Sequence, residues 1–402
     1  MRQTENRRST IVVVATCLIL ICVCSYIMHL IIENKRQLRV GFIYQGDAVT
    51  PYTRNFMYSQ EVIEKNLGSR IKTISFYNVY EESLGTLYDK VMEANCDIIF
   101  ANSFGYQDTI KEWAEKHPEI QFCQATNFQD GEPLPNLHNY MGAIHRARYT
   151  AGVVAGRKLE SLIAAGRLTR EQAVVGYVAA LPVPEVISGY TAFLLGVRSQ
   201  VPEATMKVIY VDSWSDFTKE KETTRRLLDR GCRIISQHSD TIGPAMVCEE
   251  YSAKTGKDII HVGYNGSMVA VAPNTSLVSC RIDWTPYEQA AIEAVLDGKR
   301  IEDVVKGETK GNDAWGGYKD GWIKVIGLNE YTAPSESQQL IETTMEELES
   351  RKKFVFSGPY TGVNVYDPSD RIDLSKGPFV ETKDRSAPRF CYILDDIVEI
   401  VK

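Results

Sequence analysis

LRVGFIY at Leu38–Tyr44 decides the fold that we expect for this chain, because a helix-period stretch follows it at Arg54–Leu67 and the same pairing recurs along the sequence. Each further unit begins with a short run rich in Val, Ile and aromatic residues, which is typical of a buried strand. These runs are Ile71–Phe76, Asp97–Ala101, Ile120–Ala125, Val174–Ala180, Met206–Val211, Arg233–Gln237 and Asp258–Tyr264. Strands that alternate with helices of about 10–15 residues predict parallel sheets covered by helices on both faces.

The number of expected strands indicates two sheets. About ten strands are near the upper limit for one open, twisted sheet. A chain of 402 residues is also longer than a single domain usually is. We therefore predict an α/β fold of two doubly wound, parallel-sheet lobes. Ligands of such sheets bind beyond the carboxyl ends of the strands, so the expected site is the cleft between the lobes.

Composition excludes several classes of protein. With 44% hydrophobic and 24% charged residues, the chain is neither disordered nor a polytopic membrane protein. Its 45 Lys and Arg against 52 Asp and Glu give a net charge of −7, which does not support nucleic-acid binding. Residues 40–402 carry 39 basic and 50 acidic residues, a net of −11. That charge argues against an anionic ligand such as a nucleotide and favours a neutral one.

One apolar segment stands apart from this soluble composition. Ile11–Ile32 runs for 22 residues without Asp, Glu, Lys or Arg, which is long enough to span a bilayer as a helix. We expect a single-pass membrane anchor after a short tail at residues 1–10, a cytoplasmic tail if the rest of the chain lies outside the cytoplasm. A lipoprotein is the alternative, since Cys17 follows Ala15 and Thr16. Basic residues flank the segment equally on both sides, so the charge rule does not orient it.

The sequence offers little support for catalysis or metal binding. Three of the nine cysteines lie in the apolar segment, and the other six are scattered without a CxxC or His pairing at metal spacing. We expect mostly free thiols, although a disulfide is possible, and we expect neither a metal nor a cofactor. His238 beside Asp240 lacks a third group to orient it as an acid–base pair. Glu288 and Glu293 are expected on the solvated face of their helix.

Polar and aromatic residues gather where the predicted strands end. Such groups suit a flat ligand that stacks on rings and is hydrogen-bonded at its edge. Asp and Ser at these turns could instead cap helices, but an indole has no acceptor with which to cap. Core packing is an alternative for every aromatic residue in the set. The turns are Ser103–Tyr106, Asp212–Asp216, Gln237–Asp240, Tyr264–Ser267 and Asp283–Tyr287.

Several of these strings, taken together and in order, resemble the basic membrane protein family, the purine nucleoside-binding lipoproteins of bacterial ABC importers. The resemblance extends from about Leu38 to Pro359. The motifs that carry it are SFGY at Ser103–Tyr106, RYTAGVVAG at Arg148–Gly156, PVPEV at Pro182–Val186, DSWSD at Asp212–Asp216, QHSD at Gln237–Asp240, VGYN at Val262–Asn265, WGG at Trp315–Gly317 and FSGP at Phe356–Pro359.

The resemblance implies a type I periplasmic-binding-protein fold whose two lobes close on a purine base or nucleoside. It also implies an extracytoplasmic location, ABC permease subunits as partners and a monomeric protein. We expect lobe 1 at residues 38–145, completed by about 265–325, and lobe 2 at 146–264. Residues 326–402 are expected to form a C-terminal helix and wrap, part of which completes lobe 2.

The family pattern also implies ligand-binding residues. Relatives hold the base between two rings, which correspond here to Phe56 and Trp214. An acidic residue stands nine positions before the first ring, and Asp47 keeps that spacing. Phe56 could instead belong to the apolar face of its helix. Phe104 and Tyr106 are further candidates from the SFGY motif, although packing suits both.

Other positions bear on which purine binds. Asn265 stands where many relatives have an Asp that holds ribose hydroxyls, so base binding is better supported than nucleoside binding. Nucleoside binders have a Lys near the next strand, whereas this chain has Asp283 and Trp284 there. Asp240 is the candidate acceptor at the edge of the base, unless it caps the helix that follows it.

Two other possibilities stay open from the sequence. A flavin or another flat heterocycle would suit the same pocket. An extracytoplasmic sensor domain would also use this architecture, although only ten residues precede the apolar segment, too few for a kinase or DNA-binding domain.

Overall fold

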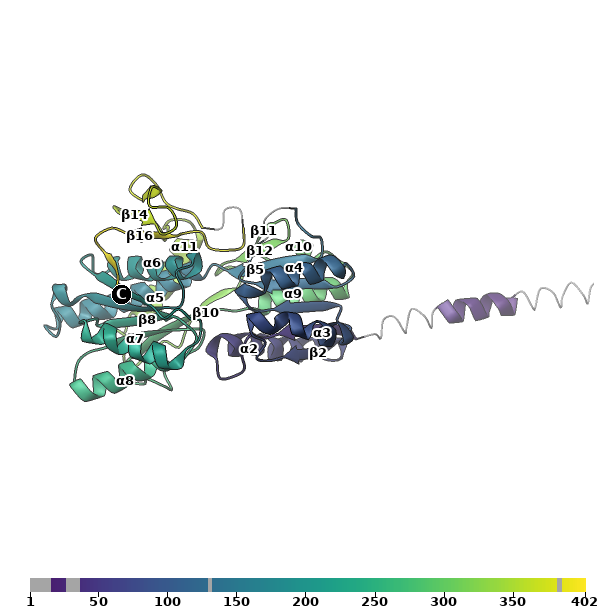
Figure 1. The fold of residues 1–402 in the computed structure, drawn as a ribbon, viewed down its shortest axis with the longest axis horizontal. Coiled ribbons are helices and arrows are strands. Elements are labelled where there is room, and N and C mark those ends of the chain that lie inside the picture. Colours follow the sequence, from purple (N-terminus) through teal and green to yellow (C-terminus); the bar gives the residue numbers. More distant parts are fainter. Residues whose placement is uncertain (1–15, 27–36, 129–131, 382–384) are drawn as a thin grey trace, which may run out of the picture.

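The computed structural model describes residues 16–26, 37–128, 132–381 and 385–402, and within them two α/β lobes lie side by side (Figure 1). Each lobe is built on a seven-stranded sheet, and a smaller three-stranded sheet lies on one of them. The predicted two-lobe α/β architecture is therefore confirmed. In both large sheets the strands are parallel except for an antiparallel strand at one edge.

Lobe 1 holds the first five strands and a segment that returns from later in the chain. Its sheet has the order β11-β12-β5-β4-β3-β1-β2. The elements are β1 (Leu38–Ile43), α2 (Pro51–Leu67), β2 (Ile71–Phe76), α3 (Tyr88–Glu93), β3 (Ile98–Ala101), α4 (Gln107–Lys116), β4 (Gln121–Ala125), β5 (Leu137–Gly142), α9 (Thr285–Leu296), α10 (Ile301–Val304), β11 (Glu308–Lys310) and β12 (Asp313–Gly316).

Lobe 2 has a sheet of the order β13-β10-β9-β8-β6-β7-β17. Its elements are α5 (Ile144–Ala164), β6 (Val174–Ala179), α6 (Pro184–Arg198), β7 (Thr205–Tyr210), α7 (Phe217–Asp229), β8 (Ile234–His238), α8 (Gly243–Thr255), β9 (Ile260–Tyr264), β10 (Ser276–Ile282), β13 (Ile323–Ile326), α11 (Ser337–Glu349) and β17 (Val398–Ile400). The small sheet holds β14 (Thr361–Asn364), β15 (Arg371–Asp373) and β16 (Tyr392–Leu394).

The chain crosses between the lobes at residues 142–144, 282–285 and 316–323. The second crossing comes later than the residue 265 at which the sequence placed it. The reason is β10, which pairs in parallel with β9 and so still belongs to lobe 2. The polar turn after β9 thus belongs to a connection between two strands of lobe 2 and is not a passage between the lobes.

Residues 326–402 were expected to form a helix and a wrap, and the helix among them is α11. After it, β14 pairs in antiparallel fashion with β15 and with β16. Because β17 pairs in parallel with β7, the end of the chain is an edge strand of lobe 2.

At the N-terminus, residues 16–26 are helical. Among the described residues no helix is both long and apolar enough to cross a membrane. The rest of the predicted anchor at 11–32 lies outside those residues, so the anchor stays a prediction. All nine cysteines are free thiols.

Two glycines set how closely α5 and α6 approach each other. A Cβ on Gly152 would lie 2.2 Å from the carbonyl oxygen of Phe193, and one on Gly196 would lie 2.1 Å from that of Tyr149. Both distances are far below van der Waals contact, and both partners are backbone atoms that cannot move independently. The two helices therefore pack backbone to backbone, and this contact forms the centre of lobe 2.

We expect Gly152→Ala to destabilise the protein by about 1–3 kcal/mol or more, because the added methyl group forces α5 and α6 apart. Urea unfolding measures the loss. Gly85→Ala is the matched control, since a Cβ at Gly85 would meet no atom within 4 Å. Equal stability of the two variants would contradict the proposed backbone contact.

Glu288 was expected on the solvated face of its helix, and that prediction is wrong. Its side chain is fully buried between α2, α9 and the sheet of lobe 1, where it accepts hydrogen bonds from Ser59 Oγ at 2.5 Å and Tyr140 Oη at 2.9 Å. Burial raises the pKa of the Glu288 carboxyl to about 8. The helix pattern could not reveal this, because the partners come from residues far away in the sequence.

The titration of Glu288 predicts a pH-dependent stability. Since its pKa is higher in the folded state than in the unfolded state, the folded protein holds the proton between about pH 4.5 and 8. Its contribution is present in full at low pH and is lost as pH rises through this window, by up to about 1.4 kcal/mol per pH unit. Glu288→Gln removes the titration, so the variant should gain stability relative to the parent from pH 5 to pH 8. Urea unfolding at unit intervals of pH tests this, and parallel pH profiles would contradict it.

Candidate ligand-binding site

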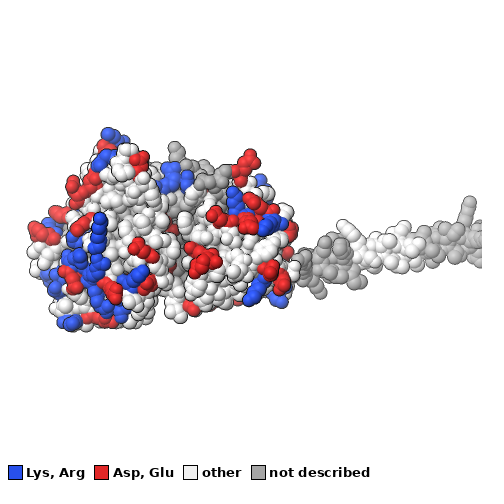
Figure 2. Space-filling model, in the orientation of Figure 1, with Lys and Arg blue, Asp and Glu red and all other residues white. Residues whose placement is uncertain are grey.

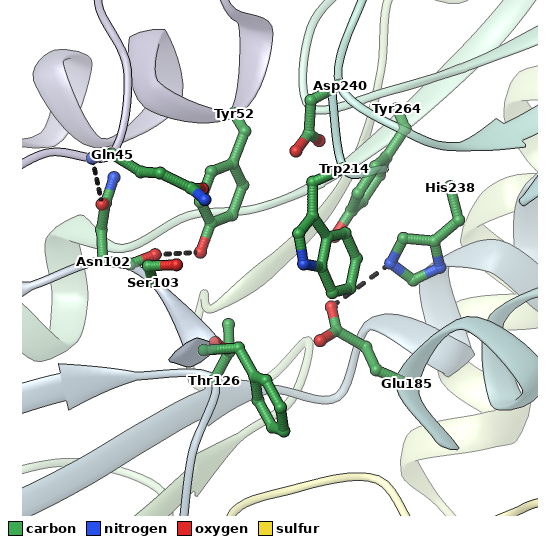
Figure 3. Close-up of a pocket in the computed structure, with 11 residues that line it drawn as sticks. Gln45, Tyr52, Asn102, Ser103, Thr126, Glu185, Trp214, His238, Asp240 and Tyr264 are labelled. Atoms are coloured by element: carbon green, nitrogen blue, oxygen red, sulfur yellow. Dashed lines mark hydrogen bonds and ion pairs between the residues drawn. The ribbon is translucent and has the colours of Figure 1, made fainter. Parts of the chain in front are cut away.

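A pocket of about 350 Å³ lies in the cleft between the lobes, at the carboxyl ends of the strands (Figure 3). Both lobes contribute to its wall, as the parallel sheets require. Lobe 1 provides Gln45, Tyr52, Asn102, Ser103, Phe104 and Thr126, and lobe 2 provides Glu185, Trp214, His238, Asp240 and Tyr264.

Four aromatic side chains line the pocket, two from each lobe, and Tyr52 and Trp214 are one from each. Tyr52, in the first turn of α2, and Trp214, in the loop between β7 and α7, lie on opposite sides in Figure 3. The Tyr52 hydroxyl donates to the carbonyl oxygen of Asn102 at 2.6 Å, which fixes the ring. The carbonyl oxygen of Trp214 accepts from the backbone N–H of Asp240 at 2.9 Å, which holds the Trp214 loop against the end of β8.

Lobe 1 provides an unpaired hydrogen-bond donor. The Oδ1 atom of Asn102 accepts from the backbone N–H of Gln45 at 2.9 Å, while its Nδ2 is buried without a partner. Leaving a buried donor unpaired costs about 1–3 kcal/mol. A ligand acceptor in the pocket would relieve that cost.

Lobe 2 provides acidic groups. Asp240 is 7% exposed and accepts from Asn265 Nδ2 at 3.2 Å. Burial, followed by the nearby carboxyls of Glu220 and Glu185, raises the pKa of Asp240 well above its usual range. Burial also raises the pKa of Glu185 to about 7, against the opposing effect of the Arg148 charge.

His238 completes this side as a neutral ring. Its Nε2 lies 3.3 Å from Oε1 of Glu185, and its Nδ1 is buried without a partner. Burial lowers the pKa of His238 well below its usual range, and the Arg148 charge acts in the same direction. The imidazole is therefore uncharged at neutral pH.

Arg148 of α5 supports the floor of the pocket from below. Its guanidinium lies 3.9 Å from the centre of the Tyr264 ring, and its Nη1 donates to Tyr177 Oη at 2.6 Å and to the carbonyl oxygen of Gln237 at 2.9 Å. The stacked cation orients the Tyr264 ring. It is also the positive charge nearest to the buried acids.

A wider chamber of about 1320 Å³ opens outside the pocket and shares Gln45, Tyr52, Trp214 and Asp240 with it. Acidic side chains line it: Asp47, Glu81, Asp212 and Asp240. On the face drawn in Figure 2, Asp and Glu side chains lie on both lobes beside the groove between them. Among the described residues, neither lining set includes a Lys or Arg. Nor does any cluster of His, Cys, Asp and Glu in the described part of the chain form a metal site.

Residues 46–357 match the family described as ABC transporter substrate-binding protein PnrA-like. The chain belongs to this family. Its members are substrate-binding proteins of ABC transporters and not enzymes, and they act outside the cytoplasm. Such a protein has a small-molecule ligand and transporter subunits as partners.

Relatives differ in the ligands that their names state. A purine-binding protein of Brucella abortus (strain 2308) is 29% identical over 330 residues, which cover 81% of this chain and 85% of the relative. A putative ABC transporter glucose-binding protein of Haloferax volcanii is 32% identical over 275 residues, which cover 68% of this chain and 62% of the relative.

Solved structures support the fold. A solute-binding protein of an ABC transporter system from Aeropyrum pernix K1 superposes with a TM-score of 0.65 at 17% identity, covering 79% of this chain and 93% of that one. An ABC transporter solute-binding protein from Conexibacter woesei superposes with a TM-score of 0.57 at 16% identity, covering 79% of this chain and 97% of that one. At such low identity the likeness concerns the fold alone.

Of the residues singled out in the sequence, Phe104, Trp214 and Asp240 line the pocket. Asp47 lies further out, where its Oδ1 accepts from the backbone N–H of Val49 at 3.0 Å in the wall of the outer chamber. Asn265 lies behind Asp240 and orients its carboxyl. The structure thus brings Trp214 and Asp240 together in the lobe 2 wall of the pocket.

Four other candidates do not line the pocket. Phe56 and Trp284 stack on each other inside lobe 1, with ring centres 4.3 Å apart, so neither faces a ligand. Tyr106 is fully buried and donates its hydroxyl to the carbonyl oxygen of Val79. Asp283 pairs with Lys324 and, at 3.8 Å, with Arg281, close to the second crossing.

The ring of α2 that lines the pocket is Tyr52, one helical turn before Phe56. Tyr52 stands four residues before Phe56, so both lie on one face of α2, with Tyr52 at the end toward the cleft. Its position right after Pro51, at the start of the helix, was the available signal. Gln45, Asn102, Thr126 and Glu185 were not singled out either, although each directly follows a predicted strand or begins a helix.

Proposed function

We propose that this protein binds a purine base or nucleoside in the cleft and delivers it to an ABC permease. The observation that carries the proposal is the pair of rings, Tyr52 and Trp214, contributed by opposite lobes to one pocket. A flat heterocycle offers a face to each ring. A hydrogen-bond acceptor at its edge would meet Asn102 Nδ2, and N–H groups would meet the Asp240 carboxyl.

The arrangement also supplies a mechanism of closure. Each ring belongs to a different lobe, so a ligand contacts both only when the lobes approach each other. Stacking contributes about 0.5–1.5 kcal/mol per aromatic pair beyond the area buried. The bound base therefore stabilises the closed arrangement over the open one, which is how a hinged two-lobe receptor signals occupancy.

Charge favours a neutral or donor-rich ligand. The acidic side chains of the outer chamber, Asp47, Glu81 and Asp212, would repel a phosphate, and no Lys or Arg among the described residues lines either space. A base or nucleoside fits better than a nucleotide. The name of the Brucella relative agrees with a purine, whereas the name of the Haloferax relative makes glucose the necessary comparison ligand.

Delivery to a permease is faster when the lobes stay near the membrane, because attachment raises their effective concentration there. We propose that residues 11–32 anchor the chain as one apolar helix with the lobes outside the cytoplasm. Lipid attachment at Cys17 is the alternative. Mass spectrometry of the membrane-extracted protein separates the two, since a lipoprotein would have lost the residues before its modified cysteine.

The function is tested by calorimetry of the purified chain with adenine, hypoxanthine, adenosine, guanosine, riboflavin and glucose. We expect a purine to bind and to change the intrinsic fluorescence. Trp214 is the partly exposed tryptophan of the chain, whereas the other four are at most 4% exposed, so Trp214→Ala should abolish that change. Binding of glucose or riboflavin without any purine would refute the proposal.

Replacing the lobe 1 ring separates Tyr52 from Phe56. We expect Tyr52→Ala to weaken purine binding about 10- to 100-fold, the usual effect of removing a stacked ring from a base. Phe56→Leu should leave the dissociation constant unchanged and lower the stability by about 1 kcal/mol, since Phe56 packs in the core. Titration calorimetry and urea unfolding of both variants measure this. The reverse pattern would restore Phe56 as the ligand's partner.

A further inference from the structure

The family match ends at residue 357, and the chain continues to residue 402. This C-terminal extension, residues 358–402, forms the small sheet of β14, β15 and β16 and adds β17 to the sheet of lobe 2. Figure 1 shows it in yellow over lobe 2, with part of it extending toward lobe 1. It is thus an addition to the shared two-lobe architecture.

The extension is fixed firmly on lobe 2. Phe390 is fully buried and stacks on Phe356, with ring centres 4.2 Å apart. The buried carboxylate of Glu381 accepts from the backbone N–H groups of Arg389 at 2.6 Å and Phe390 at 3.0 Å. Residues 389 and 390 therefore move with lobe 2.

A few residues earlier, the same extension contacts lobe 1. Ser386 is 1% exposed, and its hydroxyl donates to the carbonyl oxygen of Asn127 at 2.6 Å. The guanidinium of Arg385 lies 4.1 Å from the centre of the Phe128 ring. Asn127 and Phe128 follow β4, so these contacts join the two lobes at a place separate from the three chain crossings.

The contacted residues support the wall of the ligand pocket. The side chain of Asn127 is fully buried, and its Nδ2 donates to the carbonyl oxygen of Phe104 at 3.2 Å. Phe104 lines the pocket, as does Thr126, the neighbour of Asn127 in the chain. A continuous set of contacts therefore runs from lobe 2 through Ser386 and Asn127 to a pocket residue of lobe 1.

We propose that Arg385 and Ser386 act as positioning residues that tie lobe 1 to lobe 2 and hold the Phe104 wall of the pocket in the closed arrangement. The backbone crossings permit rotation of one lobe against the other. A hydrogen bond of 2.6 Å and a stacked cation, in contrast, are lost after a small displacement. Both contacts need the lobes to lie as they do in this structure, so they favour this arrangement over a more open one.

The link that Arg385 and Ser386 make between the lobes, called the tie below, is tested first on the ligand-free full chain. The result is then independent of the identity of the ligand. Spin labels on non-natural residues at Lys111 of lobe 1 and Lys254 of lobe 2, both exposed, report the distance between the lobes. We expect the double variant Arg385→Ala, Ser386→Ala to shift the distance distribution toward longer separations. Ser386→Thr keeps the hydroxyl and should retain the parent distribution when Arg385 is intact.

The matched control is Arg371→Ala, Ser375→Ala. These residues lie in the same extension, where they pair with Asp395 and Asp373 and not with lobe 1. An unchanged distance distribution in the Arg385–Ser386 double variant would overturn the tie. So would an equal shift in the control, because the effect would then come from general loosening of the extension.

A second measurement follows the ligand that calorimetry identifies. Loss of the tie should speed dissociation by roughly tenfold, the effect expected for one hydrogen bond and one cation–π contact. The control variant should dissociate at the parent rate. Unchanged dissociation in the Arg385–Ser386 double variant would mean that the tie does not act on the pocket. A chain that binds no purine would refute the proposed function but would leave the distance test of the tie intact.

Discussion

Parallel strand pairing is the constraint on which the rest of this structure depends. In each lobe it gathers the carboxyl ends of the strands along one edge, and the chain crossings turn these two edges toward each other. Side chains as distant in sequence as Gln45 and Tyr264 therefore meet in one pocket. The close backbone contact of α5 with α6 keeps the lobe 2 half of this arrangement rigid, so that Arg148, on α5, stays beneath Tyr264. A receptor that closes on its ligand needs such stiff halves, because only then does a small rotation bring two rings together.

The pKa values of the carboxyls in the cleft depend on the burial of several acidic side chains near a single arginine, Arg148. Glu185, Asp240 and Glu220 all have raised pKa values, with burial as the largest cause for each. Arg148 opposes the effect for Glu185 and Asp240, and hydrogen bonds from Ser239 and Thr241 oppose it for Glu220. Carboxyls that are partly protonated near neutral pH can donate as well as accept hydrogen bonds. The lobe 2 wall is therefore adaptable in its hydrogen bonding, while the lobe 1 wall adds an unpaired amide donor on Asn102.

Much of the fold could be predicted from the sequence, since most strands are apolar runs with a helix after them. The sequence did not predict β5, because LHNYMG is polar. All six of its residues are nevertheless buried. Their polar side chains have partners inside the lobe: Asn139 is hydrogen-bonded to Asp313, and His138 to Glu302 and Gln121. The site was predicted only in part. Trp214 and Asp240 follow strands directly, so topology placed them correctly. Tyr52 and Phe56 share one helix face, and only the tertiary structure determines which ring faces the cleft and which packs on Trp284. Glu288 illustrates the same limit, because its partners come from α2 and β5.

The last strand of the chain has a consequence for association. The outer edge of β7 would otherwise present a row of unpaired amide and carbonyl groups, which is a template for pairing with another molecule. β17 occupies that edge, and the backbone N–H of Val401 continues the pairing by donating to the carbonyl oxygen of Val208 at 2.8 Å. β17 is then the edge of the sheet, but it is only three residues long, and a short edge strand offers less for another molecule to pair with. A lobe 2 without β17 would expose the longer β7 and would be more prone to self-association.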